Sequence, residues 1–167
     1  GQLSAEASFK TRQNPPSFGG CFAEVEVDID LCKVRITHIL NVHDAGVIIN
    51  PALATAQVHG GMGMGIGWAL YEELLVDPAT GRVHYNNLLD YKCPTTCDIP
   101  DLACAFVETQ EPSGVYGNKS LGEPPLISPA PALRNAVLDA TGVAVNAIPM
   151  TPKLLFEEFV KAGLIKG

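Results

Sequence analysis

One acidic side chain stands in a setting that suits a general base. Glu123 lies in the run Lys119-Ser120-Leu121-Gly122-Glu123-Pro124-Pro125, between a glycine and two prolines. Pro124 biases the residue before it away from the helical region, so we expect Glu123 on a rigid, extended elbow before a helix. A general base has to stay within hydrogen-bond reach of one proton, which such an elbow allows. The alternative is a surface glutamate in a proline-rich turn, and the local sequence does not separate the two.

A cluster of five glycines invites comparison with nucleotide-binding loops; they are Gly60, Gly61, Gly63, Gly65 and Gly67. The dinucleotide fingerprint needs glycine at its first, third and sixth positions, and no register of this cluster supplies the sixth. The cluster also lies inside an expected helix rather than at its start. We therefore predict close packing of another backbone or a flat ligand against the helix, not a phosphate loop.

Two further groups of residues could be taken for reactive sites. Cys93 and Cys97, with Cys104 further on, resemble a metal site, but a closed zinc site needs four ligands and no histidine lies near them. Ordinary loop or buried thiols are the simpler interpretation. His43 and Asp44 are adjacent, and neighbours on a strand point to opposite faces, so a hydrolase triad has little support.

Hydrophobic periodicity predicts the elements that must position these residues. Residues 21–29 and 33–39 alternate apolar and polar side chains, which predicts an antiparallel hairpin with one wet face. Asn50 and Pro51 then begin a long glycine-rich helix that we expect to end near Leu74.

The second half of the chain predicts further strands and two C-terminal helices. Residues 82–89 and 102–109 suit strands, with a loop over 92–101 between them. Ser128 is expected to cap a helix that starts at Pro129 and stops at Gly142, and a last helix covers 152–162. Together these elements predict a single α+β lobe over residues 1–167.

Composition narrows the class of protein. Nearly half of the 167 residues are apolar (47%), 17% are charged, and the net charge is −7. No basic run is present, so we expect no nucleic-acid partner, and no apolar run approaches the ~20 residues of a membrane span. Five cysteines and a polar N-terminus without a signal core favour reduced thiols in the cytoplasm. Gly1 is not a translation start, so we expect the chain to be part of a longer or processed polypeptide.

Several motifs together resemble one enzyme family. The run Gly122–Pro125, with Lys119 before it and a helix ending in residues 139–143 after it, resembles the C-terminal region of the xanthine oxidase/aldehyde oxidase family of molybdenum hydroxylases. The resemblance continues upstream, in the family's order and near its spacing, through residues 22–28, 44–46, 49–51 and 57–61. Pro129 and Pro131 favour the bacterial members.

This resemblance implies roles for three residues. Glu123 falls on the family's catalytic glutamate, the base that activates the oxygen nucleophile at molybdenum. Gln57 falls on a glutamine that contacts the pterin cofactor, and an amide with both donor and acceptor suits the polar edge of a pterin. The backbone at Gly122 is expected close to the metal. The chain itself is not expected to supply a metal ligand.

The resemblance also implies what the chain lacks. The expected cofactor is a molybdenum–pterin, with its cytosine dinucleotide form as one option, while [2Fe–2S] clusters and FAD belong to other domains or subunits. The expected partners are the rest of the molybdenum-binding subunit and the iron–sulfur and FAD partners. The implied reaction is hydroxylation of an sp² carbon of a purine or related heterocycle with water oxygen, as in purine metabolism.

The alternatives within the family are aldehyde, nicotinate, carbon monoxide and hydroxybenzoyl-CoA oxidoreductases. A non-catalytic assembly piece is the alternative from another class. Because one lobe cannot enclose such a cofactor, we expect the chain alone to be inactive.

Overall fold

The computed structural model describes residues 1–10 and 13–166. Its elements in chain order are β1 (Phe18–Asp28), β2 (Lys33–Asp44), α1 (Pro51–Leu70), β3 (Leu102–Phe106), the short 3-10 helix η1 (Val115–Gly117), α2 (Pro124–Ile127), α3 (Pro129–Thr141) and α4 (Pro152–Lys161). The α+β class is therefore confirmed. Among the described residues, no helix is both long and apolar enough to cross a membrane.

The three strands form one sheet in the order β1-β2-β3. β1 and β2 pair antiparallel and confirm the predicted hairpin, although both strands extend beyond the predicted bounds. Glu24 pairs with His38 and Val25 pairs with Ile36, so Thr37 is an extra residue in β2 and forms a β-bulge. The bulge shifts by one residue the alternation of inward-facing and outward-facing side chains along β2. Val34 and Ile36 are buried before the bulge, and Ile39 is buried after it.

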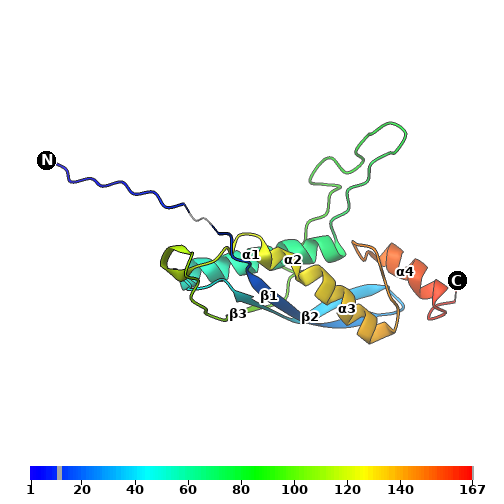
Figure 1. Cartoon of the computed structure of the whole chain (residues 1–167). Coiled ribbons are helices and arrows are strands. Elements are labelled where there is room, and N and C mark those ends of the chain that lie inside the picture. The colour runs from blue at the N-terminus through cyan, green and yellow to red at the C-terminus, as the bar shows by residue number, and fades with distance from the viewer. Residues whose placement is uncertain (11–12, 167) are drawn as a thin grey trace.

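β3 pairs parallel to β2, with Ile39 opposite Leu102 and His43 opposite Phe106. A parallel pair needs a long crossover, and α1 with the segment after it provides the connection. The strand predicted over 82–89 is wrong, because only an isolated bridge joins Val76 to Val83. That segment projects away from the body of the protein, where no sheet edge can pair with it (Figure 1).

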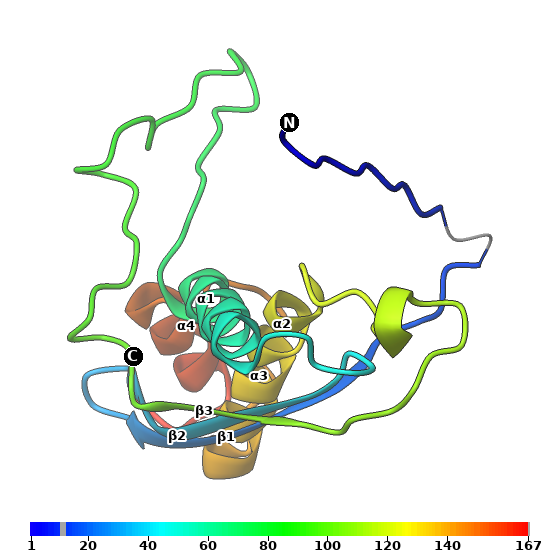
Figure 2. The same ribbon diagram turned by 90° about the vertical axis from the view of Figure 1, so that its left-hand side faces the viewer.

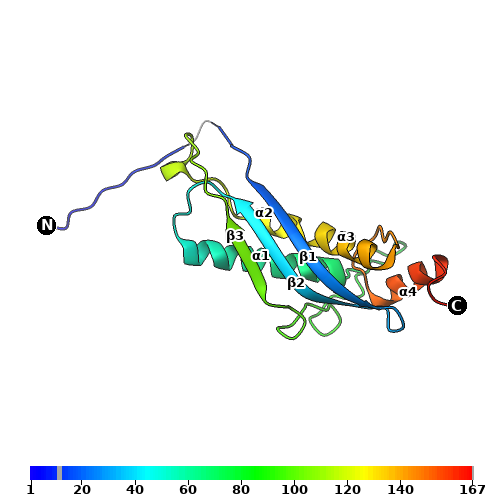
Figure 3. The same cartoon turned by 90° about the horizontal axis from the view of Figure 1, so that it is seen from below.

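The helices lie on one face of the sheet. Figure 2, a view nearly along α1, shows α1, α2 and the start of α3 above the strands, with the end of α3 reaching below them, and Figure 3 shows the strands in front of the helices. The core between the layers is formed by Ile36, Ile39, Val58, Met62, Ile66, Leu133, Val137, Leu155 and Phe159, all at most 7% exposed. The sheet and the three helices α1, α3 and α4 are thus held by one continuous apolar core.

The predicted start of α1 is confirmed. Asn50 Oδ1 accepts a hydrogen bond from the amide of Leu53 at 3.1 Å, and Pro51 opens the first turn. The helix ends at Leu70 rather than near Leu74, because the amides of Tyr71 and Glu72 both donate to the carbonyl of Gly67.

The C-terminal helices follow the prediction with one correction. Gly142, with φ of 72°, ends α3, and α4 matches the predicted last helix closely. Ser128 does not cap α3: it has a helical backbone, and its hydroxyl donates to Asn41 Oδ1 at 3.1 Å instead. The reason is that α2 runs almost directly into α3, so the chain at Ser128 is already helical.

Candidate functional site

The loop that leads to Glu123 is fastened to the end of β2. Val47 N donates to the carbonyl of Gly117 at 2.9 Å, and Lys119 N donates to the carbonyl of Ala45 at 2.7 Å. An isolated antiparallel bridge joins Gly46 to Asn118 between these two bonds. The predicted sequence motifs around residues 44–46 and 119–125 are therefore neighbours in space, although more than 70 residues separate them.

Glu123 occupies the position before α2, but its backbone is not extended as predicted. Its φ of −106° and ψ of −15° lie in the helical region, and its carbonyl accepts the amide of Leu126 at 2.9 Å. This first helical hydrogen bond outweighs the bias that Pro124 imposes on the residue before it. The side chain of Glu123 is exposed, and within the described chain its carboxylate has no hydrogen-bond or ion-pair partner.

The two residues predicted to bind the cofactor contact each other. Gln57 Nε2, on α1, donates to the carbonyl of Gly122 at 2.5 Å. This bond commits one end of the amide, and the exposed position of Gln57 leaves its Oε1 available to a ligand. Gln57, Gly122 and Glu123 thus lie together at one end of the helical layer.

A cavity of about 360 Å³ lies beside these residues. It is bounded by residues 45–50, by the first turns of α1 through Gln57 and by residues 118–122. Most of its walls are apolar, and the polar side chains are those of Asn50, Gln57, Asn118 and Lys119. Such a combination is typical of a site that binds a small molecule or cofactor.

Glycines at this end of the protein are not explained by the chain's own packing. A Cβ added to Gly122 or Gly60 would meet no atom within 4 Å, and neither residue has a positive φ. Gly60 lies one turn beyond Gln57 on α1, where glycine costs about 1 kcal/mol of helix propensity relative to alanine. Gly60 and Gly122 lie near Gln57, and the packing of the chain does not explain why either is glycine. Their lack of a side chain would let a flat group approach the backbone closely.

The other glycine face of α1 packs on protein. A Cβ on Gly61 would lie 2.6 Å from Pro125 Cβ, and one on Gly65 would lie 2.8 Å from Pro129 Cβ. These contacts confirm the prediction that another backbone packs closely against the glycine helix, and they show that α2 and α3 take the place of a flat ligand at Gly61 and Gly65.

Asp44 and Lys119 form an ion pair that the sequence did not reveal. Lys119 Nζ and Asp44 Oδ2 lie 2.7 Å apart, with their side chains only 8% and 15% exposed. The hydrogen bond from Lys119, with those from Thr109 and the amide of Gly46, lowers the pKa of Asp44 from 3.8 to about 2. With 75 residues between the partners, no local spacing could have identified them.

The adjacent side chains of His43 and Asp44 have separate surroundings. His43 faces the core at 1% exposure, and neither ring nitrogen has a hydrogen-bond partner within the described residues. Burial lowers the pKa of this imidazole, which favours the neutral form. The carboxylate of Asp44 turns instead to Lys119.

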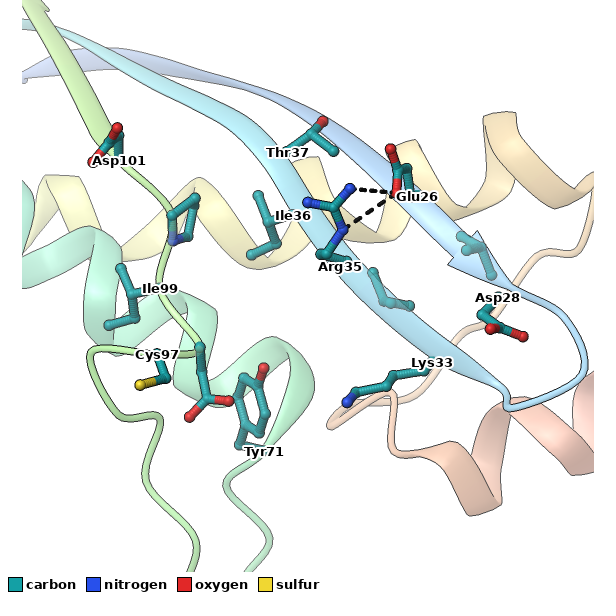
Figure 4. A pocket seen from close by; sticks show the side chains of 14 residues that line it. Glu26, Asp28, Lys33, Arg35, Ile36, Thr37, Tyr71, Cys97, Ile99 and Asp101 are labelled. Atoms are coloured by element: carbon teal, nitrogen blue, oxygen red, sulfur yellow. Dashed lines mark hydrogen bonds and ion pairs between the residues drawn. The ribbon is translucent and has the colours of Figure 1, made fainter.

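A larger cavity lies elsewhere and contains none of the predicted site residues. It measures about 710 Å³, at the hairpin end of the sheet, between β2 and the segment 97–101 (Figure 4). Two of its charged side chains, Arg35 and Glu26, form an ion pair with each other. Cys97 lines this cavity, but no group of three potential metal ligands exists among the described residues, and Cys93, Cys97 and Cys104 are free thiols.

Comparison with known proteins assigns the family. Residues 1–100 match the family described as the molybdopterin cofactor-binding domain. A xanthine dehydrogenase molybdenum-binding subunit from Escherichia coli O157:H7 is 64% identical over 99% of this chain and 22% of its own length.

Two solved structures share the fold. A carbon monoxide dehydrogenase from Oligotropha carboxidovorans has a TM-score of 0.82 and 28% identity over 89% of this chain and 19% of its own. A quinoline 2-oxidoreductase from Pseudomonas putida 86 has a TM-score of 0.75 and 35% identity over 80% of this chain and 17% of its own. The chain spans about a fifth of the curated relative and of either solved structure. It belongs to the molybdopterin cofactor-binding domain family.

Proposed function

We propose that this chain forms one wall of the molybdenum–pterin site of a xanthine dehydrogenase-like oxidoreductase. The reaction would hydroxylate an sp² carbon of a purine or related heterocycle with oxygen from water. The observation that carries the proposal is the exposed carboxylate of Glu123, which has no hydrogen-bond or ion-pair partner among residues 1–10 and 13–166 and lies next to the contact between Gln57 and Gly122. The 64% identity to a xanthine dehydrogenase subunit favours this chemistry over that of more distant members of the family.

Under this proposal, separate residues would bind the cofactor and act as the base. Gln57 would hold the polar edge of the pterin through its free Oε1, while Gly122 and Gly60 leave room for close approach of the flat ring. Bound molybdenum would supply the two-electron oxidation of the substrate carbon. Glu123 would accept the proton that water must lose before its oxygen can attack that carbon. No side chain of the described residues forms a hydrogen bond or ion pair with this carboxylate, so it is available to accept the proton.

The rest of the enzyme must come from chain that lies outside these residues. α1 is mostly apolar, with Thr55, Gln57 and His59 as its polar residues, yet it exposes the large apolar side chains of Leu53 at 69%, Met64 at 52% and Trp68 at 48%. A helix of this kind is normally covered on all sides. We assign that cover to the remainder of a molybdenum-binding subunit, of which this chain would be the C-terminal part. Iron–sulfur and FAD subunits would complete the assembly in the cytoplasm.

Replacement of Glu123 by Gln in the complete enzyme tests the proposal. The substitution keeps the size of the side chain and removes its ability to accept a proton at neutral pH. We expect turnover of a purine substrate to fall by about 10²–10⁴-fold, because a positioned base contributes that much. Molybdenum content and thermal stability should stay at the wild-type level, since Glu123 makes no side-chain contact in the described chain.

Glu157→Gln on α4 is the matched control, because Glu157 is also exposed and forms no hydrogen bond or close ion pair within the described residues, its one charge interaction being a longer-range attraction to Lys161. It should leave turnover unchanged. If Glu123→Gln kept more than about a tenth of wild-type turnover, Glu123 would not be the base, and the non-catalytic alternative would gain support.

A further inference from the structure

The position of the Glu123 carboxylate depends on the backbone that carries it. Within the described chain no side-chain contact holds this glutamate, and no side-chain bond caps α2 at this residue. Its place is therefore set by the backbone on its two sides: α2, which follows, and residues 117–122, which approach from η1. Any group that fixes this segment also fixes the carboxylate.

The ion pair of Lys119 and Asp44 is the buried charged anchor of that segment, beside the hydrogen bonds from Gln57 to Gly122 and from Val47 to Gly117. Lys119 precedes Glu123 by four residues, and its Nζ lies 2.7 Å from Asp44 Oδ2 at the end of β2. Asp44 Oδ1 accepts two more hydrogen bonds, from Thr109 Oγ1 at 2.7 Å and from Gly46 N at 3.0 Å. The ammonium group also lies 5.3 Å from the centre of the Phe18 ring, within the range of a cation–π interaction.

This pair joins four parts of the chain that are distant in sequence: the start of β1, the end of β2, the segment after β3 and the loop before α2. It also differs from the other ion pairs of the described residues in its burial. Lys161 and Glu158 are 67% and 26% exposed, and Arg35 and Glu26 are 69% and 64% exposed. A buried pair holds its geometry against solvent, whereas exposed pairs contribute little.

We propose that the Asp44–Lys119 ion pair is a positioning device that holds the 117–122 segment so that the Glu123 carboxylate lies at the reacting proton. The inference rests on the proposed role of Glu123 as the base. Lys119 and Asp44 act through the backbone, since neither contacts the Glu123 side chain in the structure. If one partner is removed, the other is left as an unpaired buried charge, and the segment must shift to let water reach it. A displacement of about 1 Å at a reacting group can lower a rate by about 10²-fold.

Lys119→Met in the complete enzyme tests the inference. We expect kcat to fall by about 10–100-fold while KM and molybdenum content change by less than about 2-fold, because the Lys119 side chain is 8% exposed and its ammonium group pairs with Asp44. Lys119→Arg should recover most of the lost turnover, since a guanidinium can still pair with the carboxylate. Amide hydrogen exchange over residues 117–123 should accelerate at least about 10-fold in Lys119→Met.

Two controls separate positioning from general destabilisation. Lys161→Met removes the same kind of side chain from an exposed ion pair and should change neither turnover nor exchange at 117–123. Asp44→Asn combined with Lys119→Met removes both charges, so no unpaired charge remains to prevent folding. That double variant should keep its molybdenum and still lose turnover, because the segment is no longer fixed.

A third comparison tests whether the pair acts through Glu123. Lys119→Met added to Glu123→Gln should lower kcat no further than Glu123→Gln alone. Failure of Glu123→Gln to reduce turnover would overturn the proposed function and the inference together. If Glu123→Gln abolishes turnover while Lys119→Met stays within about 3-fold of wild type, only the positioning role is overturned. A loss of turnover in Lys119→Met that merely follows its loss of molybdenum would also overturn it.

Discussion

Two adjacent glycines of α1 should respond in opposite directions to the same substitution. Gly60 and Gly61 lie in the middle of one helix, so replacing either by alanine adds the same helix propensity, about 1 kcal/mol. The Cβ of Gly60→Ala would enter open space. This variant should therefore be more stable than wild type by about 0.5–1 kcal/mol.

The Cβ of Gly61→Ala would collide with α2. It would lie 2.6 Å from Pro125 Cβ and 3.0 Å from both Leu126 N and the Pro125 carbonyl carbon, where carbon atoms prefer about 3.5–4.0 Å. α2 cannot simply move away, because Asn41 Nδ2 donates to the carbonyl of Pro125 at 3.0 Å. Overpacking of this kind destabilises by about 1–3 kcal/mol.

Since the propensity gain is common to both variants, the difference between them isolates the packing of α1 on α2. We expect Gly61→Ala to be less stable than Gly60→Ala by about 1–3 kcal/mol. Urea denaturation of the 167-residue chain, followed by far-UV circular dichroism, measures this difference directly. Equal stability of the two variants would refute the close approach of α2 to Gly61, and with it the account of why this helix carries glycine there.

Three further predictions concern the site. Gly122→Ala should leave the stability of the chain unchanged, because the added Cβ meets no atom of the chain itself. It should lower the pterin and molybdenum content of the complete enzyme, because the Cβ would take up the space proposed for the cofactor. Full cofactor content would contradict that proposal. The isolated chain should bind no molybdenum and oxidise no xanthine or hypoxanthine, since it supplies one wall only; metal analysis and a turnover assay check this. Because the pKa of Asp44 is lowered from 3.8 to about 2 in the folded protein, its ionised carboxylate stabilises the fold fully above about pH 4. This stabilisation is lost as the pH falls to about 2. Asp44→Asn should therefore flatten the acid limb of the stability profile measured by urea titration, and an unchanged limb would exclude the ion pair as its source.

Much of the fold could be predicted because its signals are local. The alternation over 21–29 and 33–39 specified the hairpin, Asn50-Pro51 specified the start of α1, and Gly142 specified the end of α3. Each of these depends on the residues within one or two turns of the chain. The strand predicted at 82–89 failed because a strand also needs a partner edge, and local alternation carries no information on that.

The candidate site divides in the same way. The sequence by itself determined the chemical groups: a carboxylate at Glu123, an amide at Gln57 and a glycine at Gly122, which the family's motifs place in order. Only the tertiary structure decided that Gln57 donates to the carbonyl of Gly122 and that Lys119 pairs with Asp44. It also decided that Glu123 is helical rather than extended, because the hydrogen bond from Leu126 begins a helix there. These contacts join residues that come together only when β2, α1 and the loop before α2 pack against one another. The free energy of that packing depends on all three segments, so no single segment of the sequence predicts it.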